Sequence, residues 1–162
     1  MNNSSIPLPF DQLDYEIITL LNEDARMSAA DMEKRSGANQ RNIRKRLNRL
    51  LELGAVRLKG IVEPKVFGYG ISVDIFLACE DGYEDEILKE LTEMDPICYL
   101  AVGQSSNELS IEGRFQDFES MDHFLKKELG AIEGLSIKGF AMVPRIVKNI
   151  DSWLPPHEIF KD

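Results

Sequence analysis

The chain has 162 residues, of which 43% are hydrophobic and 29% are charged, and its net charge is -9. This composition is typical of a globular protein with one medium or two small domains, and it excludes a largely disordered chain. No apolar run approaches the roughly 18 residues that span a bilayer, and the N-terminus lacks the basic start and apolar core of a secretory signal. We therefore expect a cytoplasmic protein with no membrane segment.

The charge is distributed unevenly along the chain. Residues 1–25 carry five acidic and no basic side chains, whereas residues 26–60 carry ten basic and three acidic ones. Residues 61–162 are again acidic, with nine basic and twenty acidic side chains. Such segregation indicates two modules with different partners, and the basic module is suited to a polyanion.

Residues 11–57 are predicted to form three short helices after a flexible start, residues 1–10. The first helix has one apolar stripe at helical spacing, formed by Leu13, Ile17, Leu20 and Leu21. Predicted caps and stops are Ser28 and Gly37 for the second helix, and Asn39 and Gly54 for the third. The short turn at Gly37-Ala38 gives the last two helices the spacing of a helix-turn-helix.

The third predicted helix is strongly basic, with five positive charges and no acid between Gln40 and Leu51. Its apolar residues share one face, so its bases project outward. In helix-turn-helix proteins the start of this helix enters the major groove of DNA, where Arg bonds guanine and Asn or Gln bonds adenine. We expect base contacts from Gln40, Arg41, Asn42 and Arg44, next to the N-cap Asn39, and phosphate contacts from Lys34, Arg35, Lys45 and Arg49. The alternative is a solvated helix face that pairs with the acidic half of the chain.

The remainder of the chain alternates between strand and helix patterns. Residues 58–70 read as a β linker, and residues 71–148 follow the order β-α-β-β-α-β. This order is typical of a ferredoxin-like domain, a four-stranded antiparallel sheet with both helices on one face. The second helix of this domain is predicted through Phe118, Met121 and Leu125. The fold class is therefore α+β, with an N-terminal helix-turn-helix (winged-helix-like) domain followed by a ferredoxin-like domain.

The last predicted strand has apolar side chains on both faces. Leu135, Ile137, Ala141 and Val143 are expected on one face, with Phe140 and Met142 on the other. Two helices cover only one face, so we expect the second face to pack against a second copy of the chain. The alternative is that the N-terminal module or the tail covers it. The two cysteines, Cys79 and Cys98, lie in apolar strands and are expected to be buried reduced thiols.

The N-terminal pattern resembles that of the Lrp/AsnC, or feast/famine, transcription regulators, and the order of elements in residues 71–148 is similar to their effector-binding half. The resemblance covers about residues 11–148. The matching positions are Asp14, Asp24, Arg26, Ser28, Gly37, Asn39, Ile43, Arg44, Arg46, Leu47, Leu50, Gly54 and Val56. The resemblance implies double-stranded DNA as a partner, homodimers that associate into tetramers or octamers, and control by a small molecule, with an amino acid expected.

In the resembling family, amino acids bind at an interface between dimers, near a glycine-containing turn. Here the corresponding candidate effector site is Gly103, Gln104, Ser105, Ser106, Asn107 and Glu108. Gly103 permits close backbone approach, and the polar side chains suit an α-amino or α-carboxylate group. The alternative is a plain solvated β-turn, since Ser and Asn favour turns for local reasons.

The chain shows no pattern of catalytic or metal-binding residues, and no cofactor is expected. His123 and His157 have no Cys or His at ligand spacing. The tail, residues 149–162, is expected either to pack against a neighbouring subunit or to extend into solvent. Two rival functions remain: a siroheme decarboxylase-like enzyme, which resembles the same architecture, and an effector-independent protein that compacts DNA.

Overall fold

The computed structural model describes residues 10–103 and 107–160. The chain divides into two compact units. The first combines the residues up to Ile61 with those from Lys148 onward, and the second contains residues 62–147. The C-terminal segment therefore belongs with the N-terminal helices and not with the domain that immediately precedes it.

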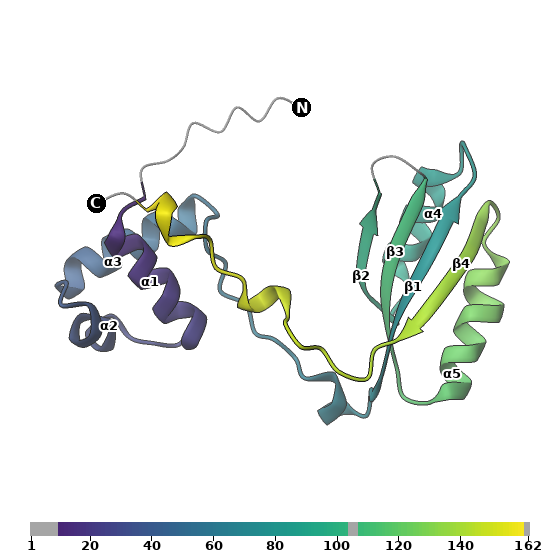
Figure 1. Ribbon diagram of the computed structural model, residues 1–162, viewed down its shortest axis with the longest axis horizontal. Coiled ribbons are helices and arrows are strands. Elements are labelled where there is room, and N and C mark those ends of the chain that lie inside the picture. Colours follow the sequence, from purple (N-terminus) through teal and green to yellow (C-terminus); the bar gives the residue numbers. More distant parts are fainter. Residues whose placement is uncertain (1–9, 104–106, 161–162) are drawn as a thin grey trace. The chain divides into compact units, whose positions relative to one another are not determined.

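The first unit has three α-helices in its described residues (Figure 1). They are α1 (Gln12–Glu23), α2 (Ala29–Ser36) and α3 (Gln40–Glu52). Each begins at a side chain that accepts a backbone N–H of the first turn, which is the role of an N-cap: Asp11 for α1, Ser28 for α2 and Asn39 for α3. The predicted caps Ser28 and Asn39 are confirmed. The apolar faces meet in one core formed by Ile17, Leu20, Leu21, Met32, Ile43 and Leu50.

The turn between α2 and α3 depends on Gly37, which has a φ of 74°. This left-handed conformation suits glycine and ends α2, and Asn39 starts α3 two residues later. Gly54, with a φ of 67°, follows the end of α3 in the same way. The predicted helix-turn-helix is confirmed. The predicted β linker is wrong, because residues 58–70, all described, contain only a 3-10 turn, Pro64–Phe67. Gly60 and Pro64 interrupt the strand pattern there.

The second unit is a four-stranded antiparallel sheet with strand order β2-β3-β1-β4 (Figure 1). Its elements are β1 (Ile71–Cys79), α4 (Glu84–Glu93), β2 (Ile97–Val102), β3 (Glu108–Phe115), α5 (Phe118–His123) and β4 (Leu135–Met142). A π turn (Phe124–Glu128) and a 3-10 turn (Leu129–Ala131) continue α5. The predicted ferredoxin-like order is confirmed.

Alternate residues of β1 and β3 pack against both helices in a single core, so the helices cover the same sheet face. This core includes Val73, Ile75, Leu77, Leu109, Ile111, Ile87, Leu91, Met121, Phe124, Leu125 and Leu129. Phe118 does not join it, because its side chain is 66% exposed at the start of α5. Phe124 and Leu129 occupy the core instead.

The predicted distribution of side chains on β4 is wrong, because the pairing of β1 with β4 is irregular. Leu77 pairs with Ile137, but Ile75 pairs with Phe140, so β4 has one extra residue between these two pairs. Such a bulge resets the alternation of side chains. Ile137 and Phe140 therefore face the same side as the buried residues of β1. Ala141, which pairs with Asp74, faces the outer side.

The outer face of the sheet is mixed in character. Asp74 lies opposite Glu112, and Glu112 forms an ion pair with Arg114. Burial and the nearby Glu112 carboxylate raise the pKa of Asp74. Phe76 and Tyr99 are the large, exposed ring side chains on this face. The expectation of two apolar faces is therefore wrong.

The two cysteines differ in their environment. Cys79 is buried at the end of β1, whereas Cys98 is exposed. Cys98 lies on the edge strand β2, where the pairing with β3 is irregular between Ile97 and Tyr99. The expectation that both thiols are buried is therefore wrong for Cys98, and both cysteines are free.

The tail packs on the first unit of its own chain, so the expectation of an extension into solvent is wrong, whereas packing against a neighbouring subunit stays a prediction. The Phe160 side chain is only 6% exposed, with its ring centroid 4.9 Å from that of Tyr15 and 6.1 Å from that of Phe10. The His157 ring meets Tyr15 edge-on at 4.8 Å, and its Nε2 lies 2.6 Å from the side-chain oxygen of Gln12. Figure 1 shows the yellow tail beside the three helices of the first unit.

Within the described residues, no helix has the length and apolar character that crossing a bilayer requires.

Candidate nucleic-acid interface

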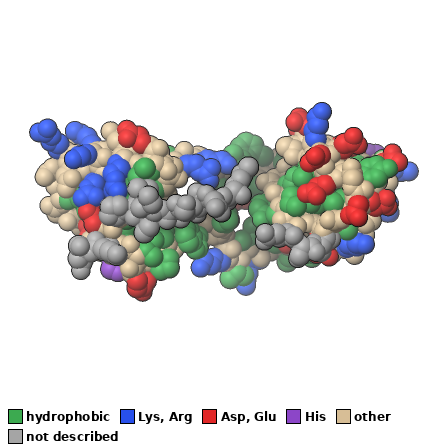
Figure 2. Space-filling view, turned by 90° about the horizontal axis from the view of Figure 1, so that it is seen from above, with side chains coloured by type: hydrophobic (Ala, Val, Ile, Leu, Met, Phe, Trp, Pro, Cys, Tyr) green, Lys and Arg blue, Asp and Glu red, His purple; other side chains and the backbone are tan. Residues whose placement is uncertain are grey.

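The exposed face of α3 is basic. Arg41, Arg44, Lys45 and Asn48 are exposed, whereas Ile43 and Leu50 on the opposite face are buried. At 100° per residue the four exposed positions fall within one arc of about 100° of the helix. Figure 2 shows Lys and Arg side chains gathered on the first unit, whereas Asp and Glu predominate on the second. The surface thus presents several cationic groups from one rigid helix.

The polar residues at the start of α3 are held by local hydrogen bonds. The Asn39 side chain accepts the Asn42 backbone N–H at 2.9 Å, as expected of an N-cap. The Gln40 amide donates to the Glu33 carboxylate at 2.8 Å and accepts from Arg44 at 3.4 Å. Gln40 therefore bridges α2 and α3 and helps to orient Arg44.

The two predicted phosphate ligands on α2 form surface ion pairs. Lys34 lies 2.9 Å from Asp31, and Arg35 donates two hydrogen bonds to Glu23. The hydrogen bond and charge of Arg35 lower the pKa of Glu23. Exposed pairs of this kind contribute little to stability, so they leave Lys34 and Arg35 available to phosphate groups.

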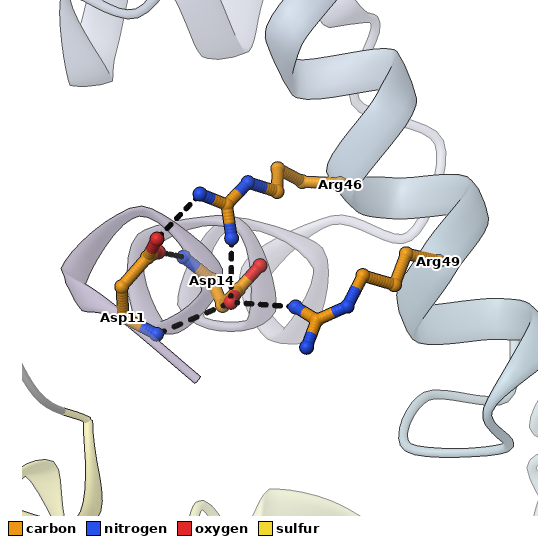
Figure 3. Close-up of polar contacts among 4 residues, drawn as sticks. All are labelled: Asp11, Asp14, Arg46 and Arg49. Carbon is orange, nitrogen blue, oxygen red and sulfur yellow. Dashed lines mark hydrogen bonds and ion pairs between the residues drawn. The ribbon is translucent and has the colours of Figure 1, made fainter. Parts of the chain in front are cut away.

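Arg46 and Arg49 point away from the exposed face, toward the N-terminus of α1 (Figure 3). Arg46 donates to Asp14 at 3.1 Å and forms a second ion pair with Asp11. Arg49 donates to Asp14 at 3.3 Å, and its guanidinium carbon lies 5.6 Å from the centre of the Phe10 ring. The predicted phosphate ligand Arg49 thus points toward α1, whereas the predicted phosphate ligand Lys45 lies on the exposed face of α3.

Sequence reasoning missed the partner of these arginines. Asp14 has an exposed fraction of 0% and is the only charged side chain that is buried in the described residues. The apolar stripe of α1 gave no indication of a buried carboxylate, although Asp14 matched the family pattern. A charge pattern that pairs acids at the start of α1 with bases at the end of α3 is the signal that could have found it.

The ion pair of Asp11 predicts an acid-dependent loss of stability. Burial raises the pKa of Asp11, but hydrogen bonds from the Asp14 backbone and from Arg46 outweigh this effect and lower it below 3.8. A lowered folded-state pKa stabilises the fold above the unfolded pKa, and that contribution disappears as pH falls through the folded value. We expect a constant melting temperature from about pH 7 to 5 and a fall below about pH 4. Asp11→Asn keeps a capping oxygen but lacks the charge, so calorimetry should find a smaller fall in its melting temperature below about pH 4. An equal fall in the variant would show that the ion pair of Asp11 is not the cause.

The candidate effector loop is only partly described. Gln104, Ser105 and Ser106 lie outside the described residues. Gly103 and Glu108 close the β2–β3 hairpin through a backbone hydrogen bond of 2.7 Å, and Asn107 has a φ of 49°. The Asn107 carbonyl accepts the Cys79 backbone N–H, and its side chain donates to Asp81. The hairpin is therefore tied to the end of β1.

A cavity of about 440 Å³ lies on the sheet beside this hairpin. Its lining includes Phe76, Ala101, Gly103, Glu108, Ser110 and Lys138. Apolar surface, a carboxylate and an ammonium group occur together there. This combination suits a small zwitterion with an apolar side chain.

Comparison with known proteins agrees with this geometry. Residues 10–57 match the family of winged helix-turn-helix DNA-binding domains. An HTH-type transcriptional regulator of Methanocaldococcus jannaschii is 26% identical over 140 residues, which are 86% of this chain and 95% of that protein. The HTH-type transcriptional regulator FL11 of Pyrococcus furiosus is 25% identical over 126 residues, covering 77% of this chain and 83% of FL11.

Solved structures share the fold. A transcriptional regulator of Neisseria meningitidis in complex with L-Met has a TM-score of 0.85 at 17% identity, covering 93% of this chain and 99% of that one. AsnC of E. coli has a TM-score of 0.75 at 21% identity, covering 89% of this chain and 99% of AsnC.

The fold, the basic helix and these relatives define the class: the chain is a transcription regulator with a helix-turn-helix DNA-binding domain. Its arrangement of a helix-turn-helix unit and a ferredoxin-like unit is that of the Lrp/AsnC regulators, so the resemblance seen in the sequence is confirmed.

Proposed function

We propose that the chain is a sequence-specific regulator that acts in the cytoplasm as a homodimer and places one α3 helix from each copy in the major groove. The observation that carries this proposal is the exposed cationic face of α3, formed by Arg41, Arg44 and Lys45. Two such helices about 34 Å apart meet the same side of a duplex in successive turns. Because the rest of the chain is acidic, a single helix should bind DNA weakly.

Exposed apolar side chains on the second unit support the dimer. Phe76 and Tyr99 on the outer sheet face are exposed. Contact with a second copy would remove them from water. Further association into tetramers or octamers would use surfaces that remain after this pairing.

We also propose that an amino acid controls assembly or DNA affinity from the cavity beside the β2–β3 hairpin. The neighbour from Neisseria meningitidis, with the same fold, was solved with L-Met. In this chain, Lys138 would pair with the α-carboxylate and Glu108 with the α-ammonium group, while Phe76 and Ala101 would contact the side chain. An effector changes the DNA-binding equilibrium only if its affinity differs between the two assembly states.

The proposed function predicts linked binding of DNA and amino acid. Fluorescence anisotropy with a duplex from upstream of the chain's own coding region should give cooperative binding. L-Met or another amino acid at saturation should change the apparent Kd about fivefold or more. Light scattering after size exclusion should show a dimer or a larger assembly.

A variant and a control test the proposed cavity. Ala101→Phe fills part of it and should abolish the heat of amino-acid binding in calorimetry, whereas Lys126→Ala in the π turn that follows α5 should not. Cooperative DNA binding that no amino acid alters would refute the effector and leave the DNA-binding role intact. A monomer that binds no duplex would refute the whole proposal.

A further inference from the structure

We propose that Asp14 and Asp11 position the recognition helix α3, and that Arg46 and Arg49 are positioning residues and not phosphate ligands. This inference rests on the proposed docking of α3 in the major groove. It assigns to the start of α1 a role in DNA recognition, although α1 itself does not present the basic face.

The contacts converge on one carboxylate oxygen. Oδ2 of Asp14 accepts hydrogen bonds from Arg46 at 3.1 Å, from Arg49 at 3.3 Å and from the Asp11 backbone N–H at 3.2 Å. The other nitrogen of the Arg46 guanidinium donates to Asp11 at 2.5 Å. Figure 3 shows both guanidinium groups reaching from α3 to the first turn of α1.

The burial of Asp14 restricts how α3 can lie against α1. Asp14 is fully buried, and the side chains of Arg46 and Arg49 are 27% and 31% exposed. A buried carboxylate without its cationic partners is strongly unfavourable, so a rotation or shift of α3 that separates them is resisted. Removing one partner of such a pair leaves an uncompensated buried charge, so the contact favours the arrangement of α1 and α3 in which all partners meet.

The position of the arginines on α3 explains why DNA contact would depend on them. Arg46 and Arg49 are three residues apart, on one flank of the helix, between the buried stripe and the exposed arc. Rotating α3 to release them would turn the exposed arc that holds Arg41, Arg44 and Lys45. Since base contacts need hydrogen-bond distances, a small rotation of this arc would weaken recognition.

A double-mutant cycle tests the assignment. Asp14→Asn and Arg46→Met should each weaken binding to the upstream duplex about tenfold or more, which corresponds to the loss of one bidentate base contact. The affinity of the double variant should be no more than about twofold lower than that of either single variant, because both substitutions remove the same interaction. Affinity is compared at a temperature where melting curves show every variant folded, so that a loss of stability alone leaves Kd unchanged.

Arg46→Lys separates positioning from phosphate binding. Lys keeps the charge but cannot bridge Asp11 and Asp14 with two nitrogens. Positioning predicts that Arg46→Lys binds as weakly as Arg46→Met. A phosphate contact predicts near-normal binding by the Lys variant and a salt slope smaller by about 0.9 in Arg46→Met. Near-normal binding by Arg46→Lys with the smaller salt slope of Arg46→Met, or full additivity in the cycle, would overturn the inference. If Asp14→Asn does not fold, Arg46→Lys alone tests the inference. Arg26→Met, on an exposed turn of the same unit, is the control and should bind normally.

Orientation can also be measured without DNA. Spin labels on cysteines introduced at Glu16 on α1 and Asn48 on α3 report the distance between the two helices. The labels are placed in a Cys98→Ser background, because Cys98 is an exposed free thiol. Asp14→Asn should broaden or shift the distance distribution, and an unchanged distribution would overturn the inference. Because this readout needs no duplex, absence of DNA binding would refute the proposed function separately.

Discussion

Replacing Arg41, Arg44 and Lys45 together by Ala is expected to lower affinity for duplex DNA about a thousandfold, at about 1–3 kcal/mol for each contact. All three side chains are exposed on α3. Lys45 is the predicted phosphate ligand of the three, so the slope of log affinity against log salt should also fall by about 0.9, the contribution of one neutralised phosphate. Ala favours the helix more than the residues it replaces, so α3 should persist. Anisotropy titrations at several salt concentrations measure both quantities.

A charge-matched control is available on the second unit. Lys89, Lys126 and Lys127 are also exposed, and replacing them by Ala removes the same formal charge. That variant should retain its affinity apart from a small general effect of the more negative net charge. Equal losses in the two triple variants would mean that overall charge, and not the α3 face, governs binding. Arg44→Ala alone should fall between the triple variant and the unchanged chain.

Phe160→Ala is expected to lower the free energy of unfolding of the first unit by about 3 kcal/mol, the cost of truncating a buried phenylalanine. The Phe160 ring contacts Tyr15 and Phe10, and Phe10 also lies beneath the Arg49 guanidinium. Loss of the ring would therefore leave a cavity beside α1. Urea unfolding followed by far-UV circular dichroism measures the change, and only the transition of the first unit should move.

The adjacent residue provides the control for Phe160. Ile159 is 52% exposed, so Ile159→Ala should change the free energy of unfolding by less than about 0.5 kcal/mol. Equal effects of the two substitutions, or no effect of either, would show that the tail does not stabilise the first unit. A change confined to the unfolding transition of the second unit would contradict the assignment of the tail to the first unit.

Local signals in the sequence were sufficient for most of the fold. Ser28 and Asn39 bond the backbone of their own first turns, and Gly37 supplies a left-handed φ, so each acts within a few residues. The alternation of Val73, Ile75 and Leu77 likewise depends on strand geometry alone. The exposed bases of α3 could be located because the helical period places them opposite the apolar stripe. These features depend on short-range chemistry, which is why the helix-turn-helix and the βαββαβ order were predictable.

Other features depended on which distant segments meet. The extra residue in β4 appears only in its pairing with β1, and it moved Phe140 to the helix side of the sheet. Phe160 is buried because the tail returns to α1, about 145 residues away in the chain. The buried side chain of Asp14 has its ion-pair partners in two arginines from α3, more than 30 residues further along the chain. No local pattern carries this information, since the free energy of a buried charge or an aromatic ring depends on neighbours that only the folded chain provides.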